Sequence, residues 1–169
     1  MDTFLTIASK RDTRGYRDDP LPTEAVQRIL DAGRIAGSGK NRQARRFIVL
    51  SADVQQEASH HVTRPSNVRG AALVIAVVIE EGTYSVFDAA RAAQNMMLAA
   101  WSELIASCPN AVKDAGSLKA LFQLSDGESV AILVSFGYPA RQVHPEERSA
   151  PAWIEAADRV PLADAVEYR

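Results

Sequence analysis

Three short runs of mainly apolar residues predict strands in this chain. They cover residues 47–50, 71–79 and 130–136. The second run, AALVIAVVI, is rich in β-branched residues and lies between Gly70 and Glu80, which is typical of a central strand buried on both faces. The third run ends at Gly137-Tyr138-Pro139 and is interpreted as a further central strand.

Helical periodicity covers much of the remaining chain. Helices are predicted over residues 2–9, from Thr23 to Ala36, and over residues 53–61, 87–106 and 111–122. The fourth is apolar nearly all round, with a narrow polar stripe formed by Asp88, Arg91, Asn95 and Ser102. Such a helix must be buried, and its many alanines favour a subunit interface as well as a place in the core.

The last thirty residues have too little apolar content for a core of their own. Their few large apolar side chains are Trp153, Ile154, Val160 and Leu162. These favour a tail that lies across another surface. We expect one domain over residues 1–169, with residues 140–169 as a C-terminal extension.

Composition narrows the function. A length of 169 residues allows one domain with a real core, and 47% hydrophobic with 24% charged residues is ordinary for a soluble protein. The net charge of −2 argues against general nucleic-acid binding. Cations exceed acids in the first fifty residues, and acids exceed cations from residue 80 onward. A local basic site in a mildly acidic protein indicates a small anionic ligand.

The remaining signals point to a cytoplasmic protein that binds neither membrane nor metal. The single cysteine, Cys108, cannot form an intrachain disulfide and is interpreted as structural. Residues 1–10 lack the pattern of a signal peptide, and the apolar stretch at 92–102 is too short to cross a bilayer. His60 and His61 are adjacent, so they point in different directions and make a poor metal site.

Residues 34–47, RIAGSGKNRQARRF, form the first candidate site. They contain five cations and no acid: Arg34, Lys40, Arg42, Arg45 and Arg46. The loop Gly37-Ser38-Gly39 can bend sharply and bring backbone N–H groups close to a ligand. A helix–loop–strand junction of this kind suits an anion or a flat polar heterocycle, although solvated surface has the same pattern.

A second basic cluster, Lys10, Arg11 and Arg14, ends the first predicted helix. Taken alone, it is explained by cations placed favourably at a helix C-terminus. Read in order, however, the chain shows K-R-x-x-R-x-Y, then D-x-P-L-P, then I-L-x-A-x-R-x-A-G-S-x-x-N-x-Q-x-x-x-F. This ordered set resembles the nitroreductase family of FMN-dependent oxidoreductases. The similarity is clearest over residues 5–50 and continues through residues 88–101, 130–139 and 159–162.

The resemblance implies an α+β fold, with a mostly antiparallel central sheet flanked by helices. It also implies a homodimer built on the long helix, a C-terminal tail that wraps the partner, and two FMN sites at the interface. The implied cofactor-binding residues are Lys10, Arg11, Arg14, Gly37, Ser38, Gly39, Asn41, Gln43 and Arg159.

Each implied role has a physical reason. The three N-terminal cations would hold the flavin phosphate, ribityl chain and pyrimidine edge, with Arg14 beside the N1–C2=O edge. Arg159 would close on the phosphate, since arginine forms bidentate hydrogen bonds with phosphate oxygens. Residues 37–41 would reach the flavin from the partner, and the amides of Asn41 and Gln43 match a uracil-like edge.

The implied activity is an NAD(P)H oxidoreductase with ping-pong transfer of hydride through flavin N5 to a nitroaromatic, quinone or free flavin. Because the flavin carries the redox chemistry, no catalytic side chain is predicted. One alternative is a non-catalytic carrier or sensor of flavin or another anionic ligand. A third is a specialised member that remodels a flavin or a halogenated aromatic. The physiological acceptor and the choice between NADH and NADPH stay open.

Four departures from the family pattern favour weaker FMN binding or a more open pocket. Asp12 replaces the usual serine, Ala44-Arg45 replaces Pro-Trp, and the connection at residues 80–86 is short. Residues 107–111 read Ser-Cys-Pro-Asn-Ala where a glycine-rich loop is expected. The backbone donor to flavin N5 is therefore unassigned.

Overall fold

A computed structural model of the chain describes residues 1–82 and 84–169. The chain divides into two compact units. The larger contains residues 11–142, and the smaller combines residues 1–10 with residues 143–169. Each unit is described below by itself.

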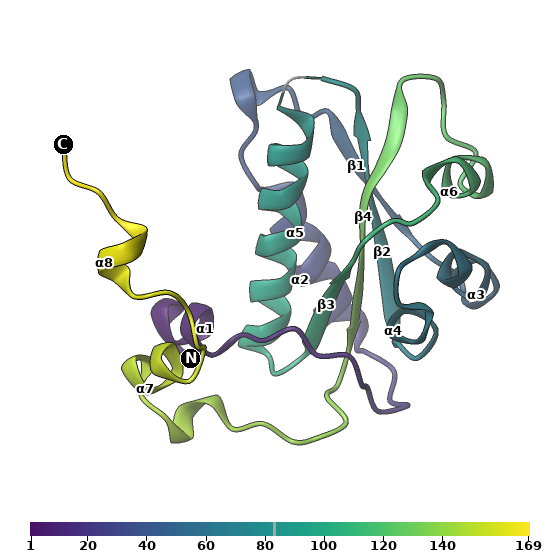
Figure 1. The fold of residues 1–169 in the computed structure, drawn as a ribbon. Helices are drawn as coiled ribbons and strands as arrows, with labels where there is room; N and C mark the ends of the chain where they lie inside the picture. Colours follow the sequence, from purple (N-terminus) through teal and green to yellow (C-terminus); the bar gives the residue numbers. More distant parts are fainter. Residues whose placement is uncertain (83) are drawn as a thin grey trace. The chain divides into compact units, whose positions relative to one another are not determined.

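The larger unit is built on a four-stranded sheet in the order β1-β2-β4-β3 (Figure 1). Its strands are β1 (Arg45–Val49), β2 (Leu73–Glu80), β3 (Ala106–Asn110) and β4 (Glu128–Gly137). All three neighbouring pairs are antiparallel. This confirms the three strands expected from apolar runs and the α+β class with an antiparallel sheet. β3 was not predicted, because Ser107-Cys108-Pro109 shows neither alternation nor β-branched residues.

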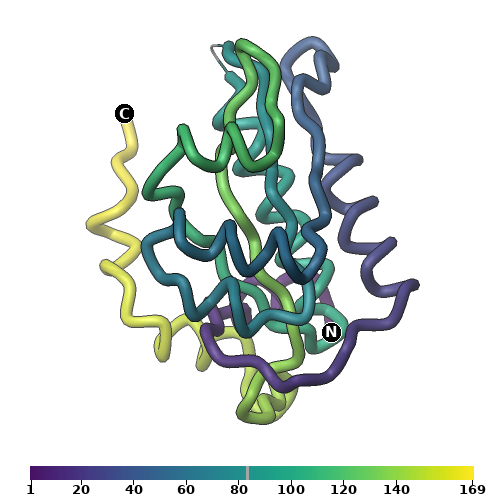
Figure 2. Tube along the Cα trace, turned by 90° about the vertical axis from the view of Figure 1, so that its right-hand side faces the viewer, coloured from purple at the N-terminus to yellow at the C-terminus, as the bar shows by residue number. Residues whose placement is uncertain are grey.

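Helices cover both faces of the sheet (Figures 1 and 2). The helices α2 (Thr23–Arg34) and α5 (Ser85–Ser102) pack on one face, and the shorter α3 (Ala52–Ala58), α4 (Pro65–Arg69) and α6 (Ala115–Leu121) pack on the other. Along β2, Ile75 and Val77 join the core under α2 and α5, whereas Val74 and Ala76 join the core under α3, α4 and α6. The uninterrupted apolar run follows, because every side chain of the strand core faces a helix layer.

The long helix α5 differs from its prediction at the C-terminal end. It ends at Ser102 and not at Ala106, because the chain turns at Leu104, where φ is 61°, and then pairs with β4. Arg91, Asn95 and Ser102 are exposed, as the polar stripe predicted.

The segment before α2 runs along one end of the sheet. Asp12 forms a parallel bridge with Ser107 of β3, and Tyr16 bridges Pro139 just beyond β4. Gly137 lies directly under the Tyr16 ring, so a Cβ atom there would come within 2.9 Å of ring carbons. The segment that carries Arg14 is therefore fixed to β3 on one side of Arg14 and to the end of β4 on the other.

The smaller unit joins the two ends of the chain through the packing of α1 (Thr3–Ser9) and α7 (Ala150–Glu155). Asp2 caps α1 by accepting a hydrogen bond from the Leu5 N–H at 2.9 Å. The Trp153 indole N–H donates to the Pro145 carbonyl at 2.8 Å. A final short helix, α8, covers Leu162–Ala165. That this tail wraps a partner subunit stays a prediction.

Among the described residues, no helix is both long and apolar enough to cross a membrane. The predicted short connection at residues 80–86 includes residue 83, which lies outside the described residues.

Candidate functional site

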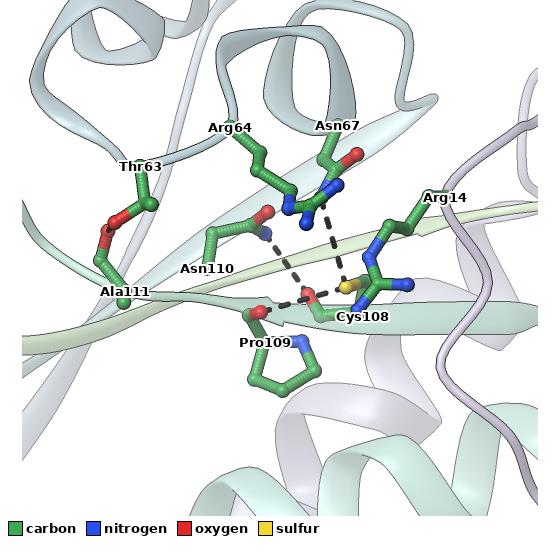
Figure 3. Close-up of a pocket in the computed structure, with 8 residues that line it drawn as sticks. All are labelled: Arg14, Thr63, Arg64, Asn67, Cys108, Pro109, Asn110 and Ala111. Carbon is green, nitrogen blue, oxygen red and sulfur yellow. Dashed lines mark hydrogen bonds between the residues drawn. The ribbon is translucent and has the colours of Figure 1, made fainter.

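A pocket of about 160 Å³ opens beside β3 (Figure 3). It is called the β3 pocket below. Its lining residues come from the segment before α2, from the turn into α4, and from β3 and its end: Arg14, Thr63, Arg64, Asn67, Cys108, Pro109, Asn110 and Ala111. Three parts of the chain that are far apart in sequence therefore meet at one place.

Two cations, Arg14 and Arg64, line this pocket. Arg14 and Arg64 are both exposed, and no acidic residue is among the described residues that line the pocket. In the part of the chain that the structure describes, neither guanidinium forms a hydrogen bond or ion pair with another residue. Two unpaired cations on one small pocket favour an anion or an electron-rich carbonyl edge.

Two buried amides complete the polar lining. Asn67 and Asn110 are 4% and 3% exposed. The Asn67 amide donates to the Cys108 sulfur at 3.8 Å, and the Asn110 amide donates to the Cys108 carbonyl at 2.9 Å. The Asn110 Oδ1 atom is buried and has no hydrogen-bond partner among the described residues. A buried unsatisfied acceptor is costly, so a ligand N–H that reached it would be bound favourably.

A hydrogen-bond network under the pocket fixes Asn110. Its amide also donates to the Ser135 hydroxyl oxygen at 3.0 Å, and the Ser135 hydroxyl lies 3.0 Å from the Tyr16 phenol. Burial raises the pKa of Tyr16, so the phenol stays neutral and can donate. The network joins β3, β4 and the Arg14 segment, and it holds the pocket floor in one arrangement.

The predicted loop lies elsewhere, at the start of α5. The segment 37–43 is called the α2–β1 loop. Its Gly39 N–H donates to the Asp88 carboxylate at 3.3 Å, and its Gln43 N–H donates to the Ser38 hydroxyl at 3.0 Å. The helices α5 and α4 cover opposite faces of the sheet (Figure 1). The loop contacts α5, whereas the β3 pocket is lined from α4, so the two lie on different sides of the sheet. No residue of the loop lines the β3 pocket.

We expected the glycines of this loop to form its sharp bend, but other residues adopt the left-handed conformation. The left-handed residues are Lys40, Asn41 and Gln43, with φ values of 51°, 53° and 54°. Gly37 instead permits close packing, because a Cβ atom there would lie 2.6 Å from the Arg91 guanidinium. The sharp turn therefore comes from non-glycine residues.

Arg45, one of the departures from the family pattern, binds the end of a helix. Its Nη2 atom donates to the Ala36 carbonyl, and it lies 3.4 Å from the Arg34 carbonyl oxygen. A cation at a helix C-terminus is favoured by the helix dipole. Its charge therefore stabilises α2 and the start of the loop, and Arg45 does not line the β3 pocket.

Of the predicted site residues, only Arg14 lines the β3 pocket. Arg11 lies on the same segment, and Gly37, Ser38, Gly39, Asn41 and Gln43 belong to the α2–β1 loop. Lys10 and Arg159 belong to the smaller unit. Lys10 is the C-cap of α1, as its position predicted, and Arg159 donates to the Ala157 carbonyl at 2.9 Å. The shared cofactor role of these residues stays a prediction.

Sequence reasoning missed most of the pocket. Arg64 and Asn67 lie in R-P-S-N, where the proline at the start of α4 was the one local signal of a helix. Cys108 was interpreted as structural; it is buried and also contributes to the pocket lining. No spacing in the sequence connects these residues with Arg14, because β3 brings them together.

An apolar groove of about 310 Å³ lies on the α5 side of the sheet. It shares Pro109 with the β3 pocket. The other lining residues come from α5 and β4: Val86, Ala89, Ala90, Ala93, Gln94, Met97, Ala131 and Ile132. Val86 and Phe87, on the first turn of α5, are 69% and 63% exposed. This face of α5 has apolar surface that no described residue of the chain covers.

The fold and the site allow comparison with known proteins. The sequence profile of the nitroreductase family matches residues 7–76 and 63–138. The chain belongs to the nitroreductase family. A search of curated proteins finds no match.

Solved structures with the same fold match 85% or more of the chain. A protein of Desulfovibrio desulfuricans, provisionally described as a nitroreductase and solved in complex with FMN, is 27% identical with a TM-score of 0.84, over 100% of this chain and 97% of that one. A nitroreductase family protein of Clostridium difficile 630 is 24% identical with a TM-score of 0.83, over 99% and 98%. A protein of Clostridium acetobutylicum, provisionally described as an NADH oxidase, is 22% identical with a TM-score of 0.75, over 85% and 97%.

Proposed function

We propose that this chain is an FMN-dependent NAD(P)H oxidoreductase that works as a homodimer. The observation that carries the proposal is the β3 pocket, where Arg14 and Arg64 face one cavity with no acid among its described lining residues. Membership of the nitroreductase family supports it, as does the FMN complex of the Desulfovibrio desulfuricans protein.

The residues of the pocket fit one edge of a flavin. The pyrimidine edge of the ring presents two carbonyl oxygens separated by an N–H. Guanidinium groups donate to such oxygens, and an unsatisfied amide oxygen accepts from such an N–H. Arg14, Arg64 and Asn67 supply the donors, and Asn110 Oδ1 is the unsatisfied acceptor. A pocket of about 160 Å³ would take this edge and not the whole ring.

FMN bound here would supply the redox chemistry, by which hydride from NAD(P)H would reduce a small electrophile such as a nitroaromatic, a quinone or a free flavin. The residues of this chain bind and orient the ring. The charges of Arg14 and Arg64 would favour negative charge on a ring edge held in the β3 pocket. We assign no side chain as nucleophile, acid or base. The description of the Clostridium acetobutylicum neighbour names NADH, which supports a nicotinamide donor.

The homodimer would bring together the two regions that one chain keeps apart. The α2–β1 loop lies on the α5 side of the sheet, away from the β3 pocket. A second copy could place its loop, with Gly37, Ser38, Gly39, Asn41 and Gln43, on the flavin of the first. The exposed Val86 and Phe87 and the apolar groove beside α5 provide the kind of surface that a dimer buries.

Lys10, Arg11 and Arg159 complete the proposed cofactor set as phosphate ligands. Their assignment rests on the family resemblance and on the affinity of cations for phosphate.

A second candidate is a carrier or sensor that binds a flavin or another anionic ligand without turnover. It is favoured by Asp12, whose carboxylate lies on the same segment as Arg14 and contributes to the raised pKa of Tyr16. A carboxylate at this position opposes the binding of a phosphate.

The visible spectrum of the purified protein tests the proposal. It is recorded before and after FMN addition and desalting, and then with NADH or NADPH under anaerobic conditions. A retained flavin band that either nucleotide bleaches supports the oxidoreductase. A retained band that neither bleaches favours the carrier or sensor, and loss of flavin on desalting contradicts the assignment of FMN as a tightly held cofactor.

A further inference from the structure

The α2–β1 loop adopts a conformation that its sequence does not favour. Lys40, Asn41 and Gln43 all have positive φ, a region that costs energy for residues with a Cβ atom and that asparagine tolerates best. Three such residues within four positions stay in place only when surrounding contacts hold them.

The holding contacts come from α5 and from the ends of the loop. The Asp88 carboxylate accepts the Gly39 N–H at 3.3 Å, and the Arg91 guanidinium lies 4.0 Å from that carboxylate and packs on Gly37. The Asp88 side chain is only 13% exposed, although it belongs to a surface helix.

The loop side chains, in contrast, point to solvent. Lys40, Asn41, Arg42 and Gln43 are all exposed. A fixed backbone with exposed polar side chains is suited to presenting those side chains to another molecule at little further entropic cost.

We propose that Asp88 and Arg91 are positioning residues that hold the α2–β1 loop preformed, so that Asn41 and Gln43 meet the FMN bound by a second copy of the chain. This inference rests on the proposed function for the identity of the ligand. The clamp itself is a property of one chain and can be tested without FMN.

The central variant is Asp88→Ala, which removes the acceptor of the Gly39 N–H. Asp88→Asn is its conservative counterpart, because an amide oxygen can still accept that hydrogen bond. Asp31→Ala is the matched control, since Asp31 also pairs with an arginine three residues later, Arg34, at 3.0 Å but makes no hydrogen bond to the described residues of the loop.

The first measurement is amide hydrogen exchange over residues 36–44 in the FMN-free protein. We expect faster exchange in Asp88→Ala, with α2 and β1 unchanged, and exchange close to the wild type in Asp88→Asn and Asp31→Ala. Unchanged exchange in Asp88→Ala would overturn the clamp. This result does not depend on whether FMN is the cofactor.

The second measurement is the dissociation constant of FMN, from quenching of flavin fluorescence. Loss of one positioning hydrogen bond should weaken FMN binding roughly 3- to 10-fold in Asp88→Ala, with recovery in Asp88→Asn. A loosened loop with unchanged FMN affinity would overturn the positioning role. Failure of the wild-type protein to bind FMN would instead overturn the proposed function, which the exchange data distinguish.

Gly37→Ala is an independent check of Arg91. A Cβ atom at this position would displace the guanidinium, so loop exchange should rise, and it should rise no further when Arg91→Ala is added. If the two substitutions raised loop exchange additively, the packing of Arg91 on Gly37 would not be the contact that holds the loop.

Discussion

The β3 pocket and the α2–β1 loop both present polar groups, but they are built in opposite ways. The pocket gathers residues from three distant segments on a strand edge, and its floor is a network of buried side chains. The loop is one short segment whose backbone is pinned by its neighbours while its side chains are exposed. A binding site can therefore be positioned either by packed side chains or by a backbone that its neighbours hold in place. Substitutions should affect these two kinds of site differently.

The largest expected effect is the loss of both pocket cations. Arg14→Ala combined with Arg64→Ala should weaken FMN binding more than about 100-fold, because each removes a charge-assisted hydrogen bond worth about 1.5–3 kcal/mol. Each single variant should bind FMN about 10-fold more weakly than the wild type. Fluorescence titration with FMN measures this, and the oligomeric state should not change.

Arg69→Ala is the matched control for these variants. Arg69 is an exposed cation of α4 that does not line the pocket. Equal losses in Arg69→Ala and Arg64→Ala would mean that overall charge, and not the pocket, attracts the ligand. Full flavin content in Arg14→Ala would remove its assignment.

The next effect concerns the floor of the pocket. Asn110→Ala removes hydrogen bonds to Cys108 and Ser135 and should cost about 1–3 kcal/mol of the free energy of unfolding. Tyr16→Phe, which removes only the phenol end of the network, should cost about 1 kcal/mol. Denaturant unfolding compares them, and a stable Asn110→Ala with reduced FMN affinity would show that the network binds ligand without supporting the fold.

A matched pair of glycine substitutions sharpens the description of the loop. Lys40→Gly and Gln43→Gly each relieve a left-handed residue and should change the free energy of unfolding by no more than about 1 kcal/mol, because relief of strain offsets the added flexibility of the unfolded chain. Only Gln43→Gly should weaken FMN binding, since Lys40 is not assigned to the ligand. Equal loss of FMN affinity in both would assign the role to the backbone alone.

The smallest expected effect lies outside both regions. The Arg46 guanidinium contacts Glu128 at 2.7 Å and, together with the Ser125 N–H that also donates to this carboxyl, lowers the pKa of Glu128 from 4.5 to about 2. A lowered carboxyl pKa means that the ionised form stabilises the fold above pH 4.5 and that this contribution is lost as the pH falls toward 2. The stability difference between wild type and Glu128→Gln should therefore shrink over that range.

FMN affinity at neutral pH should be unchanged in Glu128→Gln. A change in FMN affinity would mean that the pairing of β1 with the sheet affects the ligand site. We do not expect this, because the Arg46–Glu128 pair belongs to neither the β3 pocket nor the α2–β1 loop.

The sequence pointed to the α2–β1 loop as a candidate site, but of the β3 pocket it pointed only to Arg14. The loop could be found because its residues are contiguous and its glycines, cations and amides stand together. The β3 pocket could not, because Ser107-Cys108-Pro109 has no strand pattern and because pairing across β4 decides what lies beside Arg14. Ala71–Ile79 was predicted well for the opposite reason, since burial on both faces leaves a continuous apolar run. The left-handed conformation of Lys40 and Gln43 carried no sequence signal, because neither residue type favours positive φ.

The smaller unit contains two of the cations that we propose as phosphate ligands. Lys10 and Arg159, which lie near opposite ends of the sequence, belong to one unit in which α1 packs against α7. A proteolytic cut that released residues 143–169 would remove Arg159 and would also strip α1, which precedes Lys10, of its packing partner. Lys10 and Arg159, two of the three proposed phosphate ligands, therefore depend on the same packing of α1 with α7, and shortening either end of the polypeptide would affect both.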